Sequence, residues 1–321
     1  MEHYSNTKLR AFLKYEDGLA VLGLNGKTLF RVPDAVTELS KTEKLVLDKN
    51  NLIELPASIS KLKNLIVLIL DNNKITELPA VIGDLRELRV LRVSYNQLVG
   101  LPTSVQRLTK LEELYLDGNK LTELHSGIGD LRELRELSVS YNQLIGLPTS
   151  VQRLTKLEWL DLDGNRLTEL PAEIGDLREL KTLWMRNNQL VGLPTSIQRM
   201  TKLEWLYLDG NKLTELPTEI GDLRELRQLW VTDNQLVGLP TSVQRLTKLE
   251  RLYLDGNKLT ELPAEIGDLR ELRQLSVSNN PLTVDAMRRA LKLKKKGVRV
   301  YDDAGKHSGY CSYLEVRKKP R

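Results

Sequence analysis

A 23-residue period runs through most of this chain and constrains its fold more than any other feature. The pattern L-x-x-L-x-L-x-x-N-x-L recurs without insertion, and a degenerate first copy begins at Leu19, with Lys27 at the asparagine position. The asparagines of the pattern are Asn50, Asn73, Asn96, Asn119, Asn142, Asn165, Asn188, Asn211, Asn234, Asn257 and Asn280. Repeats of this length in strict register predict a solenoid of about twelve turns, in which each turn is stable only when stacked on its neighbours.

The x-L-x-L-x part of each repeat alternates as a strand does when one of its faces is buried. The leucines then point inward, and the residues between them point to solvent. A return segment such as LPTSVQRLTKL at 101–111 supplies apolar residues from the opposite side of the core. The expected fold is an α/β solenoid, a horseshoe with a parallel sheet on its concave side and a helical or irregular convex side.

These motifs resemble the leucine-rich-repeat superfamily, and in particular its intracellular 23-residue class with L-P-x-x-I/V-x-x-L-x-x-L return segments. Scribble-type and Ras-suppressor-type proteins and animal innate immune proteins made only of such repeats belong to this class. The resemblance covers roughly residues 19–282. It implies a ladder of hydrogen-bonded asparagine side chains between turns, and a protein that binds partners rather than an enzyme.

The ends of the repeat array are expected to be capped. In residues 1–18, Leu9, Phe12 and Leu13 fit an amphipathic helix with Ser5 or Asn6 as its N-cap. Residues 19–282 form the repeats. In residues 283–301, Thr283 is expected to cap a helix that runs to about Lys296 and stops at Gly297, before a short strand. Residues 302–321 form a basic tail.

The net charge of +5 is a local property of the C-terminal region. Residues 283–321 carry 12 basic and 4 acidic residues, so the remainder is slightly acidic and does not predict a nucleic-acid groove. With 1 Cys and 3 His, the chain predicts no disulfide framework, metal site, cofactor or catalytic triad. No apolar stretch reaches the roughly 18 residues of a transmembrane helix.

A second period of 46 residues arises because two repeat types alternate. Four complete units begin at Ala80, Ser126, Ala172 and Thr218, and 31 of their 46 columns are identical in all four. Six of the strongly varying columns belong to the outward side of the strands: Val90/Glu136/Thr182/Gln228, Arg92/Ser138/Trp184/Trp230, Ser94/Ser140/Arg186/Thr232, Tyr95/Tyr141/Asn187/Asp233, Glu113/Trp159/Trp205/Arg251 and Tyr115/Asp161/Tyr207/Tyr253.

Two interpretations account for this variation. Drift at exposed positions would produce it, and so would diversification of the concave face for ligand contact. Against drift, the exposed return-segment residues Thr103, Gln106, Arg107 and Lys110 are unchanged in every unit. The contrast favours a concave surface that diversified for binding.

All four tryptophans of the chain fall in these concave columns. Equivalent residues on adjacent strands lie about 5 Å apart, so the aromatic residues are expected to form a continuous strip about 15–20 Å long. The candidate ligand-binding residues are Tyr115, Trp159, Asp161, Trp184, Arg186, Trp205, Tyr207, Gln228, Trp230, Arg251 and Tyr253. Exposed aromatic patches mark interaction sites, but rings that only stack on one another are the alternative.

Other polar features have plainer interpretations. The Asp-Gly-Asn triplets at Asp117, Asp163, Asp209 and Asp255 indicate turns rather than calcium ligands, because two strand spacings, about 10 Å, separate them. His125 replaces a proline, and Cys311 lies in the tail. The basic run Lys292, Lys294, Lys295, Lys296 and Arg299 fits a solvated capping helix or a surface for an anionic partner such as a headgroup.

The sequence therefore predicts a non-enzymatic recognition protein. The resemblance favours innate immune recognition of microbial surface molecules, such as lipopolysaccharide or other glycans, or of a microbial protein. A cytosolic scaffold or regulator of a small GTPase or phosphatase is the alternative. The start of the chain has no apolar signal-peptide core, so we expect a cytoplasmic location, with release by a route that needs no signal peptide as the alternative. The sequence leaves the oligomeric state open.

Overall fold

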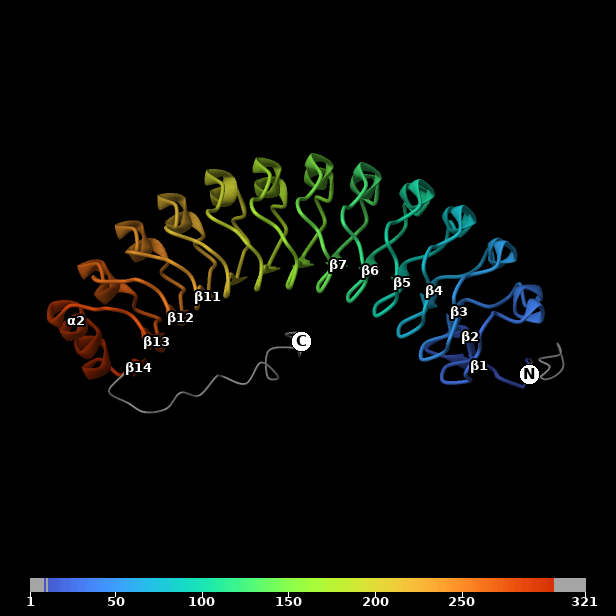
Figure 1. Ribbon diagram of the computed structural model, residues 1–321, viewed down its shortest axis with the longest axis horizontal. Coiled ribbons are helices and arrows are strands. Elements are labelled where there is room, and N and C mark those ends of the chain that lie inside the picture. Colours follow the sequence, from blue (N-terminus) through green and yellow to red (C-terminus); the bar gives the residue numbers. More distant parts are fainter. Residues whose placement is uncertain (1–8, 10, 303–321) are drawn as a thin grey trace.

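The computed structural model describes residue 9 and residues 11–302, which form one curved solenoid (Figure 1). The strands line the concave side, and short 3-10 helices cover the convex side. This arrangement confirms the expected α/β horseshoe with a parallel concave sheet.

The described residues contain one 14-stranded sheet whose strands follow the order of the chain. Its strands are β1 Leu13–Glu16, β2 Leu19–Gly23, β3 Lys44–Val46, β4 Val67–Ile69, β5 Val90–Arg92, β6 Glu113–Tyr115, β7 Glu136–Ser138, β8 Trp159–Asp161, β9 Thr182–Trp184, β10 Trp205–Tyr207, β11 Gln228–Trp230, β12 Arg251–Tyr253, β13 Gln274–Ser276 and β14 Arg299–Tyr301. Neighbours from β2 to β14 are parallel, and equivalent residues of successive repeats pair directly, as Leu137 does with Leu160.

The N-terminal end differs from the expected helical cap. Leu13 begins β1, which pairs antiparallel with β2 and places Leu13 opposite Leu22. The helix prediction was wrong at Leu13, because the chain turns back at Asp17 and Gly18, both with positive φ, and covers the first repeat with a hairpin. Leu9 is fully buried in the core, and the expected caps Ser5 and Asn6 lie outside the described residues.

The convex side consists of short 3-10 helices at Asp34–Glu38, Ala57–Lys61, Ala80–Asp84, Thr103–Arg107, Ser126–Asp130, Thr149–Arg153, Ala172–Asp176, Thr195–Arg199, Thr218–Asp222, Thr241–Arg245 and Ala264–Asp268. A proline precedes ten of them in extended conformation, and His125 takes this place in the helix at Ser126–Asp130. Proline suits the start of a helix because the amide it lacks would have no partner there. The residue after each helix, a leucine everywhere except at Met200, leaves the helical region, so the chain returns to the sheet after one turn.

The core lies between these two layers. Each repeat contributes two inward apolar residues at its strand, such as Leu114 and Leu116, and apolar residues of the return segment, such as Leu108 and Leu111, all fully buried. The second inward position is valine or methionine on alternate repeats, as at Met185. Because every repeat presents apolar residues at the same height, the core is continuous from Leu9 to Val298.

The ladder asparagines satisfy the backbone groups at the turn that follows each strand. Asn165 shows the pattern: its Oδ1 accepts from the Leu144 amide at 3.0 Å, and its Nδ2 donates to the carbonyls of Val139 and Leu162, each at 3.0 Å. One buried side chain thus joins two consecutive turns. The same set of bonds recurs at the other ladder asparagines, as at Asn142 and Asn188.

The C-terminal end is closed by helix α2, Val284–Lys295. The Thr283 hydroxyl accepts from the Ala286 amide at 3.3 Å, and Ala286, Ala290 and Leu293 are buried against the last repeat. Gly297 has a φ of +94°, which turns the chain into β14 at the edge of the sheet. Within residues 9 and 11–302, no helix is both long and apolar enough to cross a membrane.

Removing a ladder asparagine is expected to lower stability strongly. Asn165→Ala leaves the Leu144 amide and two buried carbonyls without partners, so the free energy of unfolding falls by about 2–3 kcal/mol. Urea unfolding followed by tryptophan fluorescence measures this loss. The control Gln143→Ala removes a neighbouring side chain outside the ladder and changes the midpoint little. Equal effects for the two variants would contradict the structural role of the ladder.

Candidate functional site

The concave face presents three columns of outward side chains. The first column holds the first residue of each strand, the central column holds the third, and the third column holds the residue two positions after the strand. On β9 these are Thr182, Trp184 and Arg186, and the inward Leu183 and Met185 between them are buried. Because the strands are in register, each column runs straight across the sheet.

Six aromatic rings form an unbroken chain of contacts along this face, which we call the aromatic strip. The ring centroids are 6.1 Å apart for Tyr115–Trp159, 5.5 Å for Trp159–Trp184, 5.8 Å for Trp184–Tyr207, 5.5 Å for Tyr207–Trp230 and 4.0 Å for Trp230–Tyr253. Two contacts are edge-to-face and three are tilted, both favourable arrangements for aromatic pairs. Ring stacking, the plainer alternative, is therefore present in the structure, and ligand binding by the strip remains a proposal.

The strip is less exposed than the sequence suggested. Tyr207 and Tyr253 are 4% and 8% exposed, whereas Trp159, Trp184 and Trp230 are half-buried. Neighbouring rings cover the tyrosines, whose hydroxyls are bonded: Tyr207 donates to Gln228 Oε1 at 3.3 Å and Tyr253 to Gln274 Oε1 at 2.5 Å. Trp205, in the first column, is half-buried and lies beside this chain of ring contacts. The indole faces are thus the accessible part of the strip.

Arg186 is the most enclosed positive charge of the face. Its guanidinium contacts Asp163 through Nε at 2.9 Å and a terminal nitrogen at 2.7 Å, with both side chains nearly inaccessible to water. It also lies 5.0 Å from the Trp184 ring and 5.4 Å from the Tyr207 ring. The sequence placed Arg186 and Asp161 at the border of an exposed strip, but they are 9% and 7% exposed because the aromatic rings and Asp163 enclose them.

The aspartates of the third column have a structural task that the turn interpretation missed. Each accepts a hydrogen bond from the backbone amide two residues beyond the next strand. Asp163 accepts from the Arg186 amide at 2.7 Å, Asp209 from the Thr232 amide at 2.9 Å, and Asp117 from the Ser140 amide at 3.2 Å. Asp71 and Asp255 do the same for Ser94 and Ser278. The sequence signal for this role is that the aspartates recur every second turn, whereas the intervening turns carry Ser, Arg or Thr at the same position.

Burial perturbs several of these carboxyl groups. Burial raises the pKa of Asp209 to about 7, against the lowering effect of the Thr232 bond and the charge of Arg186. The pKa of Asp161 is also raised, first by burial and then by the adjacent charge of Asp163. Burial likewise raises the pKa of Tyr207 to about 12. The guanidinium of Arg186 therefore interacts electrostatically with three enclosed carboxyl groups, those of Asp161, Asp163 and Asp209.

Two indole nitrogens of the strip differ in their partners. Trp230 Nε1 donates to Gln228 Oε1 at 3.2 Å, and Gln228 thereby joins Trp230 to Tyr207. Trp184 Nε1 is buried and has no hydrogen-bond partner. Buried donors are usually satisfied, so this nitrogen would gain from a hydrogen-bond acceptor that reached it.

The structure explains part of the contrast between the concave face and the return segments. Lys110 pairs with Glu87 at 2.6 Å and Arg107 with Asp84 at 3.2 Å, and both pairs recur in the following units, as at Lys156–Glu133. These columns are unchanged because they link successive turns. In the part of the chain that the structure describes, Thr103 and Gln106 are exposed and their side chains form no hydrogen bond. The argument against drift therefore depends on these two columns.

The remaining predicted residues lie apart from the strip or at its end. Arg251 is exposed in the first column of β12. The basic run is divided: Lys292, Lys294 and Lys295 are exposed on the last turns of α2, and Lys296 Nζ reaches the Gly267 carbonyl at 3.1 Å. Arg299 lies on β14 in the first column, beside Gln274. Cys311 lies outside the described residues.

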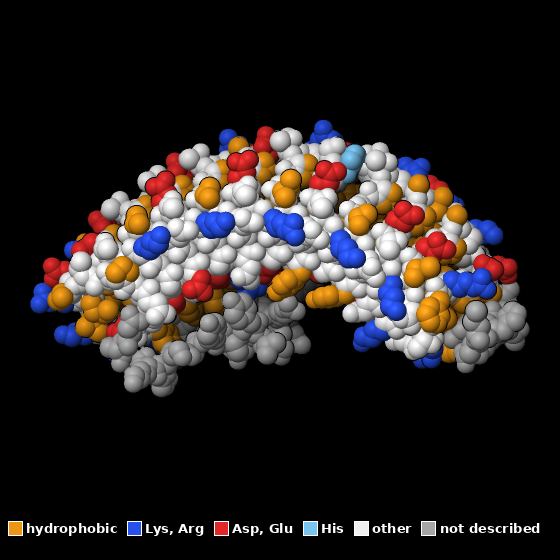
Figure 2. Space-filling model, viewed as in Figure 1, with side chains coloured by type: hydrophobic (Ala, Val, Ile, Leu, Met, Phe, Trp, Pro, Cys, Tyr) orange, Lys and Arg blue, Asp and Glu red, His pale blue; other side chains and the backbone are white. Residues whose placement is uncertain are grey.

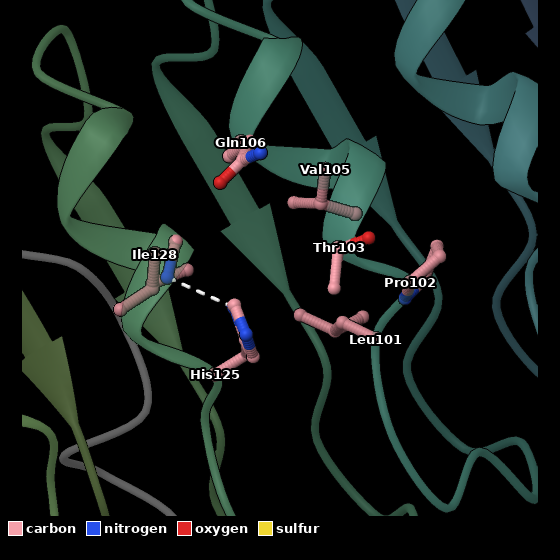
Figure 3. A pocket seen from close by; sticks show the side chains of 8 residues that line it. Leu101, Pro102, Thr103, Val105, Gln106, His125 and Ile128 are labelled. Carbon is pink, nitrogen blue, oxygen red and sulfur yellow. Dashed lines mark hydrogen bonds between the residues drawn. The ribbon is translucent and has the colours of Figure 1, made fainter.

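No cluster of metal-ligating side chains is found among the described residues. Across residues 9 and 11–302, no three His, Cys, Asp or Glu residues converge as a metal ion would require. A shallow hollow lies between the segments Leu101–Gln106 and His125–Ile128, away from the strip (Figure 3). There His125 Nδ1 accepts from the Gly127 amide at 3.0 Å, so the imidazole caps the short helix that prolines begin elsewhere.

Arg186 and Arg92 allow a matched test of burial. Arg92 bonds Asp71 at 2.9 Å and lies 4.9 Å from the Tyr115 ring, but its side chain is 44% exposed. Arg186→Ala leaves Asp163 enclosed without its ion pair and is expected to lower stability by about 3 kcal/mol, and Arg92→Ala by about 1 kcal/mol or less. Urea unfolding of both variants measures the difference, and equal losses would contradict the enclosed site.

Asp209 is expected to make stability depend on pH. Its pKa in the folded protein, about 7, exceeds the value of 3.8 for a free side chain, so the folded state holds the proton more tightly. Stability therefore rises as pH falls from above 7 towards 4. Asp209→Asn weakens this dependence, whereas Asp233→Asn, at an exposed position, leaves it unchanged. Urea midpoints across this range provide the measurement, and an unaltered profile in Asp209→Asn would refute the assignment.

Comparison with known proteins places this architecture in a family. The sequence matches the family described as a leucine-rich repeat region over residues 67–145, 147–213 and 204–295, and matches no curated protein. A solved leucine-rich repeat protein of Leptospira interrogans is 34% identical, with a TM-score of 0.64, over 87% of this chain and 82% of its own. The plant peptide hormone receptor RGFR1, solved with RGF2, is 28% identical, with a TM-score of 0.68, over 78% of this chain and 46% of the receptor. The PEPR1–AtPEP1 structure is 32% identical, with a TM-score of 0.74, over 88% of this chain and 41% of its own. The chain belongs to the leucine-rich repeat proteins.

Proposed function

We propose that this chain is a non-enzymatic recognition protein that binds an extended segment of a partner protein across its concave face. The observation that carries the proposal is the aromatic strip, a row of half-buried indoles held by stacking on one surface. Tryptophan, tyrosine and arginine dominate binding hot spots, because they combine large contact area with polar groups. Rings already held by neighbours lose little conformational freedom when a ligand covers them.

The size of the strip fits a peptide backbone. The part of the strip that carries the tryptophans, from Trp159 on β8 to Tyr253 on β12, covers four strand spacings, a distance of about 19 Å at 4.8 Å per spacing. An extended chain rises about 3.3 Å per residue, so about six residues would cross this part of the strip.

The charge of the concave face favours a basic segment. Between β5 and β12 the three columns hold seven carboxyl groups and three guanidinium groups. They are Glu113, Asp117, Glu136, Asp161, Asp163, Asp209 and Asp255, against Arg92, Arg186 and Arg251. Burial raises the pKa of Asp161 and of Asp209, and the other five carboxyl groups still outnumber the three guanidinium groups. Complementary charge speeds encounter and excludes partners of the wrong sign. Lysine or arginine side chains also stack favourably on indole faces.

The comparisons support a protein ligand at a coarser level. RGFR1 is described as a peptide hormone receptor and was solved with RGF2, which shows that a related repeat array engages a partner of that kind. The chain spans less than half of that receptor, so the receptor's activity is not transferred to it. Innate immune sensing and a cytoplasmic location remain predictions. The phosphates of lipopolysaccharide would face the excess of carboxyl groups, which makes a protein segment the better candidate.

The test titrates labelled peptides and follows fluorescence anisotropy together with intrinsic tryptophan emission. Eight-residue peptides that combine arginine or lysine with aromatic residues are compared with acidic isomers, lipopolysaccharide and a neutral glucan. Saturable binding of the basic set, weakened at least about tenfold by Trp184→Ala or Trp230→Ala, is the expected result. Gln106→Ala is the control, because Gln106 is exposed on the convex side, away from the strip.

Two outcomes would overturn the proposal. Binding of the neutral glucan or lipopolysaccharide in place of any peptide would restore the glycan interpretation. Peptide binding that is equally strong in Trp184→Ala, Trp230→Ala and wild type would move the site away from the aromatic strip. Because a basic ligand pairs with carboxyl groups, the affinity is expected to fall as salt rises.

A further inference from the structure

One flank of the solenoid carries apolar side chains that its own fold does not use. This flank, which we call the asparagine flank, lies between the ladder asparagines and the 3-10 helices. Val99, Ile145, Val191 and Val237 occupy equivalent places on it and are 59–69% exposed. They recur every second turn, about 10 Å apart. All four units keep a β-branched apolar residue at this exposed position, although nothing in the core requires it.

A glycine follows each of these residues, and the fold does not require it either. At Gly100, Gly146, Gly192 and Gly238, no atom lies within 4 Å of the place where a Cβ would stand. Their φ angles are outside the left-handed region that favours glycine. A glycine that neither the backbone conformation nor the packing demands suggests close approach by another surface. Each exposed Val or Ile thus stands beside a small gap.

On the intervening turns, a glutamate occupies the place of each glycine and a threonine the place of each valine or isoleucine. There Thr122, Thr168 and Thr214 stand level with the valines, and Glu123, Glu169 and Glu215 stand level with the glycines, all exposed. Basic residues such as Lys120, Arg166 and Lys212 lie nearer the concave side. In Figure 2, single hydrophobic side chains follow one another along this flank, with basic side chains below them and acidic ones above.

We propose that the asparagine flank is the interface of a homodimer in which two copies pair flank to flank. A partner must match a spacing of two turns over several repeats, and a second copy of this chain has that spacing. A two-fold axis pointing from the concave to the convex side reverses the strand order and keeps the curvature, so the two arcs overlie along their whole length.

This symmetry also selects the register. Overlap of all twelve turns places the axis between the turns of Ile145 and Thr168. Ile145 then faces Thr168 of the second copy, Val191 faces Thr122, and Gly192 faces Glu123. A shift by one turn would instead place Lys on Lys and Glu on Glu, which repel each other. The register of greatest overlap is therefore also the one that staggers like charges and fits glutamates over glycines.

The pairing leaves the concave face open, so it is independent of the proposed ligand. In sedimentation velocity over a dilution series, the full chain is expected to show a dimer of about twice 36.6 kDa that dissociates on dilution. Val191→Lys, and separately Gly146→Val with Gly192→Val, are expected to abolish the dimer without lowering the unfolding midpoint. Thr155→Lys, exposed on the opposite flank, is the matched control and retains the dimer.

A disulfide trap tests the register. In a Cys311→Ser background, Gly192→Cys combined with Glu123→Cys is expected to form an intermolecular disulfide on mild oxidation. Gly192→Cys combined with Glu77→Cys, about two turns out of register, is expected to form far less. A wild-type chain that stays monomeric at every concentration would overturn the proposal. So would a dimer that survives Val191→Lys and the double glycine substitution, because that dimer would use another surface.

Discussion

The structure depends on the bonds that each ladder asparagine makes to two consecutive turns. After each strand the chain turns, and the backbone amides and carbonyls of this turn are buried but no longer pair with a neighbouring strand. Asn165 and its equivalents satisfy these groups with one side chain that fits only when the turns are stacked in register. The ladder therefore sets the spacing of the turns, and the spacing aligns every other column of the molecule.

Alignment has different consequences on the three sides of the solenoid. On the convex side it brings Lys110 to Glu87 and repeats that ion pair from unit to unit, so those columns tolerate little change. On the concave side it stacks the residues of the outward columns into rows. The residues of these rows can differ from turn to turn, and so change the chemistry of the concave surface, without any change to the core. On the asparagine flank it makes turns that carry valine or isoleucine and glycine alternate with turns that carry threonine and glutamate.

Enclosing charged groups on the concave face lowers the stability of the fold, and burial elsewhere offsets this loss. Burying Arg186 with Asp163, and placing Asp161 and Asp209 nearby, takes four ionisable groups out of water. The aromatic rings on either side of the guanidinium lower that cost through cation–π contact. Burial raises the pKa values of Asp161 and Asp209 and so removes part of the carboxyl excess. A basic ligand would balance the carboxyl groups that stay charged, and this connects the electrostatics to the proposed function.

By itself the sequence determined the parallel sheet and the inward leucines, because a strict 23-residue period has one way to bury its apolar residues. It also placed the tryptophans on one face, since strand alternation assigns each residue a side. Only the tertiary structure decided how deeply those residues lie. Burial of Tyr207, Asp161 and Arg186 depends on side chains 23 and 46 residues away, and no local pattern encodes those contacts. The N-terminal hairpin at Leu13 was decided in the same way, because pairing with β2 outweighs the helical spacing of three apolar residues.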